Sequence, residues 1–162
     1  MPVAALTSNS GPNGYSCGAS SVYNTSYPAY LVFNKVNVSA NGWVSATNPS
    51  SPQSIWLNLP KAGFLKSVTI YNRTSTDVRG IIAASIQGRK VGETSYTTLI
   101  TKTDFPGSAN SQATTVEIPS TYSNTLFDSI RLEITDWHMK GQTDNHICIS
   151  EIVPEVIYPF GP

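Results

Sequence analysis

The sequence predicts an all-β domain of the sandwich or barrel type, and three observations lead to that prediction. Serine, threonine and asparagine are abundant (21, 17 and 12 residues), and with 11 glycines and 11 prolines they favour strands and turns. No window carries apolar residues at the spacing of an amphipathic helix. Short segments in which apolar and polar residues alternate follow one another instead. The 162 residues suit one domain with its own hydrophobic core.

Seven segments show the alternation expected of half-buried strands. The clearest is 129–135, where isoleucine and leucine alternate with charged residues. Many short strands with turn residues between them are typical of a β-sandwich or β-barrel. In chain order, the segments and their inward-facing residues are 54–59 (Ile55, Leu57, Leu59), 65–72 (Val68, Ile70), 82–86 (Ile82, Ala84, Ile86), 96–103, 114–118, 129–135 (Ile130, Leu132, Ile134) and 147–153.

Proline and glycine separate these segments and predict where the strands end. The first 14 residues are rich in turn formers, so we expect an N-terminal arm at 1–14 and the folded domain at 15–154. The last residues contain Pro-Phe-Gly-Pro, which cannot be helical, so 155–162 is expected to be an extended tail. The predicted boundary residues are Pro60, Gly88, Pro106, Pro119 and Gly141.

The charge of the chain excludes several classes of partner. Charged residues make up 12% of the sequence, and 10 basic residues balance 10 acidic ones. Nucleic acids and anionic membranes both require clustered Lys and Arg. No apolar run approaches the roughly 20 residues of a membrane-spanning helix, and the start lacks the pattern of a secretory signal peptide. We therefore expect no nucleic-acid partner and no membrane insertion.

Cys17 and Cys148 lie near opposite ends of the sequence. They could form one disulfide that closes the domain, or they could be two buried thiols. The cysteines and histidines lack the C-x-x-C and H-x-x-x-H spacings of a structural zinc site, so zinc is not expected.

Five groups of residues occur in a fixed order between about residues 16 and 153. They are the opening segments 20–24, 27–34 and 42–45; Ile55-Trp56-Leu57-Asn58-Leu59; Val68-Thr69-Ile70-Tyr71-Asn72-Arg73; Ser85-Ile86-Gln87-Gly88 with Tyr96-Thr97-Thr98-Leu99; and Ile130-Arg131-Leu132 with Ile149-Ser150-Glu151-Ile152. Together they resemble discoidin domains, also called coagulation factor 5/8 type C domains. The resemblance implies an antiparallel β-sandwich jelly roll of the galactose-binding-like type. Its compact form looks most like copies in phage tail and other bacterial or viral surface proteins.

The resemblance also implies a candidate calcium site. In carbohydrate-binding members, an Asp at the position of Asn34 binds calcium together with carbonyl groups of the following loop and the Glu of the last strand, here Glu151. The neutral amide of Asn34 is a weaker ligand for a hard cation than a carboxylate. The alternative is that Asn34 caps a turn while Glu151 accepts hydrogen bonds from backbone amides of the same loop.

Nothing in the sequence indicates catalysis. It contains no nucleophile elbow, no Walker loop and no H-E-x-x-H motif. A carboxylate pair for glycoside hydrolysis could come from Asp104, Asp128, Asp136 and Asp144, but no motif favours any two of them. We therefore expect a protein that is not an enzyme.

The segment 136–146 links the last two predicted strands and is the strongest candidate for a binding element. In a binding interpretation, its tryptophan is a flat platform for a sugar ring, and neighbouring polar side chains bond to the hydroxyl groups. In the other interpretation, Trp137 folds back to cover one end of the sandwich, and His138 makes a structural hydrogen bond. The candidate residues are Trp137, His138, Asp144, Asn145 and His146.

A second loop, 72–79, carries two arginines. The resemblance places Asn72 and Arg73 at the rim where the family binds its ligands, and an arginine fork at Arg73 or Arg79 suits a pair of hydroxyls or a carboxylate. The alternative is a surface ion pair between one arginine and Asp77, which would contribute little.

Trp43 and Trp56 fall at positions that resemble the family's core, so both are expected to be buried. Four tyrosines near the start could line an interface or cap the edge of the sandwich, and packing is the preferred interpretation. They are Tyr15, Tyr23, Tyr27 and Tyr30.

The leading expectation is non-catalytic binding of cell-surface carbohydrate by a virion or extracellular protein, such as a phage tail fibre or spike. Weak single sites would act through multivalency, so we expect a homo-oligomer in contact with other virion or surface proteins. The second expectation is a structural assembly or decoration protein. Lipid binding through Trp137 and Met139 ranks last, because the sequence lacks a supporting basic ring.

Overall fold

The computed structural model describes residues 3–37, 41–72, 79–106 and 113–159. Every strand pairing in these ranges is antiparallel, which confirms the all-β prediction. The strands are β1 (Ser16–Ala19), β2 (Trp43–Val44), β3 (Gln53–Asn72), β4 (Ile81–Lys90), β5 (Thr97–Lys102), β6 (Ala113–Glu117), β7 (Leu126–Trp137) and β8 (Cys148–Ile157). Three short 3-10 helices accompany them: η1 (Pro12–Gly14), η2 (Ala29–Phe33) and η3 (Ser120–Tyr122).

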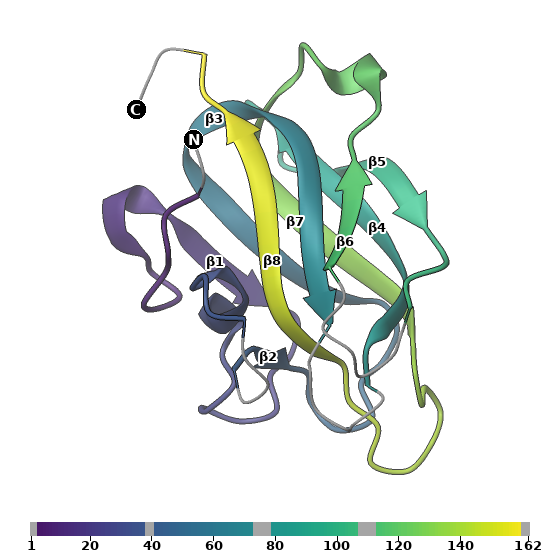
Figure 1. Cartoon of the computed structure of the whole chain (residues 1–162). Coiled ribbons are helices and arrows are strands. Elements are labelled where there is room, and N and C mark those ends of the chain that lie inside the picture. The colour runs from purple at the N-terminus through teal and green to yellow at the C-terminus, as the bar shows by residue number, and fades with distance from the viewer. Residues whose placement is uncertain (1–2, 38–40, 73–78, 107–112, 160–162) are drawn as a thin grey trace.

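The long strand β3 belongs to both layers of the sandwich. Its first half pairs with β1 and β7, and its second half pairs with β8 and β6. The strand bends over between the two halves, so that β8, the end of β3 and β6 lie in front of β1, β7 and β4 (Figure 1). The layers are therefore β1-β3-β7-β4-β5 and β2-β8-β3-β6, which confirms the predicted β-sandwich.

The two strands predicted at 54–59 and 65–72 are one continuous strand, β3, which bends between them. The register of β3 with β7 shifts between Asn58 and Gly63. Pro60 lies inside this irregular stretch, where its missing N–H costs no ladder hydrogen bond. Gly88, also expected as a boundary, lies inside β4. A Cβ added there would be 2.4 Å from the ring of Phe127, so the strand has no room for a side chain at this position.

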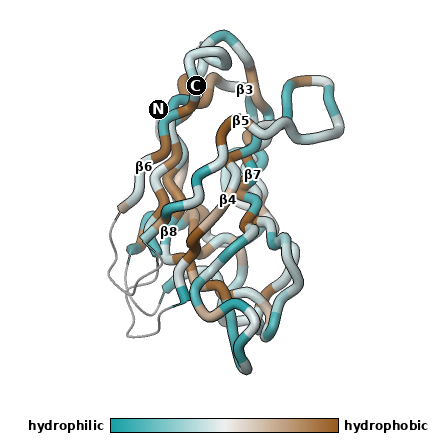
Figure 2. The backbone as a smooth tube through the Cα atoms, turned by 90° about the vertical axis from the view of Figure 1, so that its right-hand side faces the viewer, coloured by the Kyte–Doolittle hydropathy of each residue, from teal (hydrophilic) through white to brown (hydrophobic). Residues whose placement is uncertain are grey.

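The hydrophobic core lies between the two layers. Apolar and polar residues alternate along the strands, as Figure 2 shows by colour. The largest fully buried side chains come from both layers and from the segments that close the ends: Trp43, Trp137, Phe127, Leu6, Ile55, Leu57, Ile70, Ile81, Ile86, Ile134, Ile147 and Ile149.

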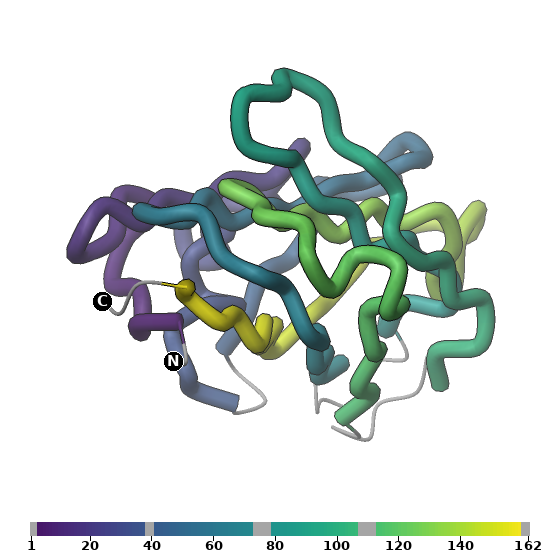
Figure 3. Tube along the Cα trace, turned by 90° about the horizontal axis from the view of Figure 1, so that it is seen from above, coloured from purple at the N-terminus to yellow at the C-terminus, as the bar shows by residue number. Residues whose placement is uncertain are grey.

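Both ends of the described chain pack on the domain. Val3 and Leu6, in the expected arm, belong to the core, and the Leu6 N–H donates to the Phe33 carbonyl at 3.0 Å. The expected tail begins inside β8, which continues to Ile157 and pairs there with β3. The first and last described residues lie on the same side of the sandwich in Figures 1 and 3. Among the described residues, no helix is long and apolar enough to cross a membrane.

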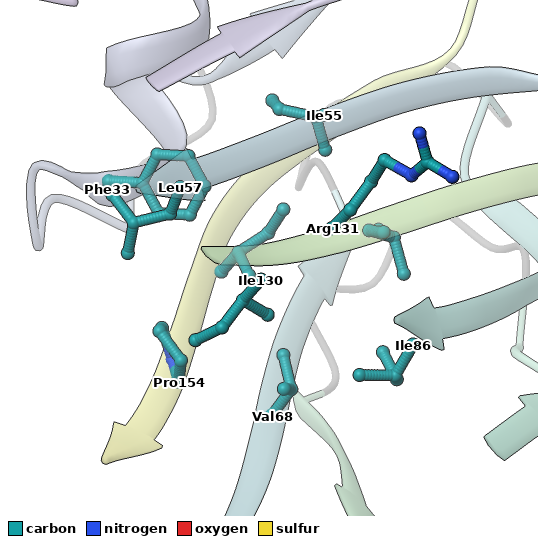
Figure 4. Close-up of a pocket in the computed structure, with 10 residues that line it drawn as sticks. Phe33, Ile55, Leu57, Val68, Ile86, Ile130, Arg131 and Pro154 are labelled. Carbon is teal, nitrogen blue, oxygen red and sulfur yellow. The ribbon is translucent and has the colours of Figure 1, made fainter. Parts of the chain in front are cut away.

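A small hollow between the layers has a volume of about 10 Å³. Apolar side chains such as Ile55, Val68 and Ile130 line it, and the guanidinium of Arg131 points away from them (Figure 4). A space of this size and polarity holds at most about one water. It is a gap in the packing rather than a ligand site.

Candidate functional site

An open hollow of about 470 Å³ lies at the end of the sandwich where the β7–β8 loop emerges, at the bottom of Figure 1. Two loops form it: the one after β7 and the one between β2 and β3. Its lining residues are Asn48, Pro49, Trp137, Lys140, Gly141, Gln142, Thr143 and Asn145.

Asn145 joins the two loops. Its Oδ1 accepts the indole N–H of Trp137 at 3.0 Å, and its Nδ2 donates to Asn48 Oδ1 at 2.8 Å and to the Gln142 carbonyl at 2.7 Å. The side chain is 4% exposed, and both its N–H groups are used within the protein. Asn145 therefore positions the loops, and this corrects its prediction as a direct ligand for sugar hydroxyls.

Trp137 is 2% exposed, so its ring face is not the open platform of the binding interpretation. The ammonium group of Lys140 lies 4.9 Å from the centre of the ring and donates to the Thr135 carbonyl at 2.5 Å. The structure therefore supports the other interpretation, in which the tryptophan covers one end of the sandwich. Trp137 still forms part of the floor of the hollow.

The remaining candidates in this loop have different environments. His138 and Asp144 are exposed, and the backbone N–H of His138 donates to the Gly80 carbonyl at 2.9 Å. His146 is 7% exposed; its Nδ1 lies 3.3 Å from the Ser45 carbonyl oxygen. The ring of Tyr23 meets it edge-on, with the ring centres 4.8 Å apart. His146 is thus a packed residue beneath an exposed tyrosine rather than an accessible ligand contact.

The ends of the β3–β4 loop lie next to the β7–β8 loop. Asn72 is 2% exposed and accepts the Ile81 N–H at 3.1 Å through its Oδ1, so its role is to shape the loop. The carbonyl of Arg79 accepts the Cys148 N–H at 3.0 Å. Arg73 lies outside the described residues. The structure therefore brings Asn72 and Arg79 to the predicted end of the sandwich.

Several residues of the hollow were not predictable from the sequence. Asn48, Pro49, Lys140 and Gln142 line it, and an Asn-Pro pair predicts only a turn. Nothing in the sequence places residue 48 beside residue 145, because the contact joins segments far apart in the chain.

The candidate calcium site lies elsewhere, between η2 and β8. Glu151 is 3% exposed and accepts the Lys35 N–H at 3.0 Å through Oε1, while its buried Oε2 has no hydrogen-bond partner among the described residues. Asn34 Oδ1 accepts the Val36 N–H at 2.9 Å. Asn34 thus caps a turn and Glu151 accepts a backbone N–H of the same loop, as in the alternative to calcium binding. The unpartnered oxygen would nevertheless suit a cation.

Burial raises the pKa of Glu151 to about 7, although hydrogen bonds from the backbone of Lys35 and Val36 act in the opposite direction. Within the described ranges, no group of three or more His, Cys, Asp or Glu side chains could hold a metal ion. Any calcium would therefore need backbone oxygens of the loop beside Glu151, and calcium binding stays a prediction.

The other two tryptophans and the two cysteines differ in how deeply they are buried. Trp43 is fully buried and donates through its indole N–H to the Ser21 carbonyl at 2.8 Å, which confirms its place in the core. Trp56 is only half-buried and lies on the outer face of the sheet, so its assignment to the core was wrong. Cys17 and Cys148 are both buried thiols and form no disulfide, which resolves the alternative left open by the sequence.

The fold is shared with proteins of known structure. No protein-family model matches the sequence, and no curated protein matches it. A family 32 carbohydrate-binding module of C. perfringens NanJ in complex with galactose is similar with a TM-score of 0.69, 22% identity and coverage of 86% of this chain and 92% of that one. An F5/8 type C domain from Bacteroides fragilis has a TM-score of 0.69 and 17% identity, with coverage of 95% and 97%.

A chain from the complex of reduced XRCC1 with the DNA pol beta catalytic domain has a TM-score of 0.66 and 15% identity, with coverage of 98% and 100%. Sequence identities at this level show a common fold and nothing finer. The chain therefore has the galactose-binding-like β-sandwich fold of F5/8 type C domains and family 32 carbohydrate-binding modules, as its motifs predicted.

Proposed function

We propose that the protein binds carbohydrate without catalysis, in the hollow beside the β7–β8 loop. The observation that carries the proposal is the character of this hollow: it is open, about 470 Å³ in volume, and four of its eight described lining residues carry amide or hydroxyl side chains beside the apolar surface of Trp137 and Pro49. Ligand sites of proteins commonly measure about 300–1,000 Å³. One protein with this fold, the NanJ module, is known in complex with galactose.

The lining favours a neutral ligand rich in hydroxyl groups. Gln142 and Thr143 supply side chains that both donate and accept hydrogen bonds, and Asn48, whose Oδ1 already accepts two bonds from Asn145, can donate through its Nδ2. Lys140 is the one charged residue among the described residues of the lining, and none of them is a carboxylate. Glycoside hydrolysis needs two carboxyl groups across the bond that is cut, and the described lining residues supply neither.

The bonds of Asn145 would preorganise the site. They fix the loop on either side of the hollow before any ligand arrives, which reduces the entropy lost on binding. An open site of this kind binds one sugar weakly. We propose that several copies act together on a surface appendage, such as a phage tail fibre or another virion or extracellular structure, where avidity raises the overall affinity.

We also propose that calcium stabilises the loop that follows η2, at the candidate site beside Glu151. Glu151 would hold the ion through its buried carboxylate, with Asn34 and loop carbonyls as further oxygen ligands. The positive charge of the ion would compensate the negative charge of the buried carboxylate.

A glycan array tests the function, with calcium and with EDTA. Two exposed residues of the lining are changed together, Gln142→Ala and Thr143→Ala, and an exposed threonine outside it, Thr94→Ala, is the matched control. We expect the control to bind as the wild type does and the double variant to bind about tenfold more weakly or not at all. A folded wild-type protein that binds no glycan, or a double variant that binds normally, would contradict the proposal.

The second candidate function is assembly through protein contacts. Val22 and Tyr23 are exposed apolar residues, 43% and 50% exposed, and neighbouring apolar side chains often mark an interface. The XRCC1 complex concerns a protein bound to another protein. Light scattering of wild type and Tyr23→Ser separates the two functions: loss of an oligomer in the variant, without glycan binding in the wild type, would favour assembly.

A further inference from the structure

The outer face of the β1-β3-β7-β4-β5 layer carries an aromatic surface that the loop site does not use. In β3, Ile55 and Leu57 are 1% exposed, while Trp56 between them points to the opposite side and is half-buried. The strand pairs Trp56 with Gly18 of β1 on one side and with Arg131 of β7 on the other. Trp56 therefore lies between the edge strand β1 and β7 on this face.

Gly18 lets the indole of Trp56 lie across the neighbouring strand. A Cβ added at Gly18 would be 2.5 Å from Trp56 Cζ2 and 2.8 Å from Cε2. The ring thus occupies the space that a side chain at position 18 would fill. One side of the indole therefore lies against the backbone of β1, and because Trp56 is only half-buried, part of the ring stays accessible for a sugar ring to stack on.

A second aromatic ring lies on the same face. Tyr96 stacks on the guanidinium of Arg131, with 4.1 Å between the guanidinium carbon and the ring centre, and its hydroxyl bonds to Ser129 Oγ at 2.6 Å. Tyr96 comes from the turn between β4 and β5, which stands away from the sandwich on this side (Figure 3). β1 and β7 are two strand spacings apart, about 10 Å, so the two rings suit a chain of sugars better than a single ring.

The charges of the face compensate one another. Arg131 Nε donates to Gln87 Oε1 at 2.6 Å, and its Nη2 lies 3.6 Å from Glu133 Oε2. Arg89 Nε lies 2.7 Å from Asp128 Oδ1. A compensated face attracts neither nucleic acid nor an acidic polymer, but its amide, hydroxyl and guanidinium groups can bond to hydroxyl groups.

From these contacts we infer a second binding site, in which Trp56 and Tyr96 stack on a neutral polysaccharide chain that lies across the outer face. Arg131, which contacts the ring of Tyr96 and donates to Gln87 through Nε, would donate its other N–H groups to hydroxyl groups of the chain. This site is independent of the hollow at the β7–β8 loop and does not require that the hollow bind sugar.

Tryptophan fluorescence offers a selective readout of this face. The protein has three tryptophans, and Trp43 and Trp137 are 0% and 2% exposed, so acrylamide quenches chiefly Trp56. We expect galactomannan, xyloglucan or mixed-linkage β-glucan to protect the wild type from acrylamide and to retard it in affinity gels. In Trp56→Phe, quenching should be weak with or without polysaccharide.

Three variants test where the polysaccharide binds. Trp56→Ala should weaken retardation about tenfold. Gly18→Ala should weaken it less, because the new methyl group tilts the indole away from the strand. Asn124→Ala, a change of an exposed residue that lies in neither site, should bind as the wild type does, and melting curves establish that each variant is folded.

Three results would overturn the inference. The first is wild-type protein that none of the three polysaccharides retards or protects. The second is binding lost in the double variant of the loop but kept in Trp56→Ala, which would assign the polysaccharide to the hollow. The third is protection of Trp56 that grows with protein concentration in the absence of polysaccharide, which would show that a second copy of the chain covers this face.

Discussion

The indole N–H of Trp137 donates to Oδ1 of Asn145 at 3.0 Å, and this bond joins the end of β7 to the far end of the loop that follows it. Through the same side chain, the loop is tied to Asn48 in the β2–β3 connection. A residue predicted as a ligand for sugar hydroxyls is thus the part that gives the loop its shape.

Replacement of Asn145 by Ala should therefore destabilise the protein. The change leaves the buried indole N–H of Trp137 and the Gln142 carbonyl without their partners, at a cost of about 2–3 kcal/mol in the free energy of unfolding. Urea denaturation measures it, with the exposed Asn124→Ala as control. A loss below about 0.5 kcal/mol would show that the loop does not depend on these bonds.

Stability in EDTA should depend on pH through Glu151. Burial raises its pKa from 4.5 to about 7, so between these values the folded protein binds a proton that the unfolded chain does not. The free energy of unfolding should therefore fall as pH rises from 4.5 to 7, by on the order of 3 kcal/mol in total. Melting curves across this range measure the fall, and Glu151→Gln should lack it.

Calcium should act on the same carboxylate. At pH 7.5 the ion would compensate the buried charge of Glu151, so added calcium should raise the melting temperature of the wild type. Glu151→Gln is expected to show no such rise, because a neutral amide binds calcium weakly. Equal melting temperatures of the wild type in calcium and in EDTA would contradict calcium binding beside Glu151.

Both cysteines should be unreactive in the folded protein. Burial raises the pKa of the Cys17 thiol to about 12, so this thiol is not ionised at pH 8, and Cys148 is 1% exposed, so the reagent cannot reach it. An Ellman assay should detect almost no thiol before denaturation and two per chain afterwards. Fewer than two after denaturation would indicate a disulfide.

Two glycines with positive φ should respond differently to substitution by Ala. Gly42 has a φ of 128°, and a Cβ there would lie 2.2 Å from the Ile149 carbonyl oxygen. Gly42→Ala must move the backbone of β8, and we expect a loss of about 3 kcal/mol or more. Gly92 has a φ of 83° with nothing within 4 Å of the added atom, so Gly92→Ala should lose only about 1 kcal/mol. Chemical denaturation of both variants provides the comparison.

The strands were predictable because alternation is a local property. In β7, Ile130, Leu132 and Ile134 are buried while Arg131 and Glu133 are half-exposed, as their spacing predicted. The bend in β3 was not predictable, because Pro60 and Gly63 also occur in ordinary turns. That they bend a continuous strand follows only from its partners, β7 before the bend and β8 after it.

The candidate site was located by its loop but not by its residues. The sequence indicated that 136–146 is unusual, and the hollow does lie there. It could not show that Trp137 is buried under Lys140, since that depends on how the loop folds back. Pro49, on the opposite side of the hollow, comes from a loop far away in the chain.

By itself, then, the sequence determined the all-β class, the faces of most strands and the kinship of the fold, because these follow from alternation and from ordered motifs. The tertiary structure decided which tryptophan is accessible. Trp137 is buried and donates its indole N–H to Asn145. Trp56 instead lies on the outer surface of the sheet, over the backbone of β1 at Gly18, which has no side chain. Burial is set by what a neighbouring segment presents to a side chain, and that neighbour is known only once the chain has folded.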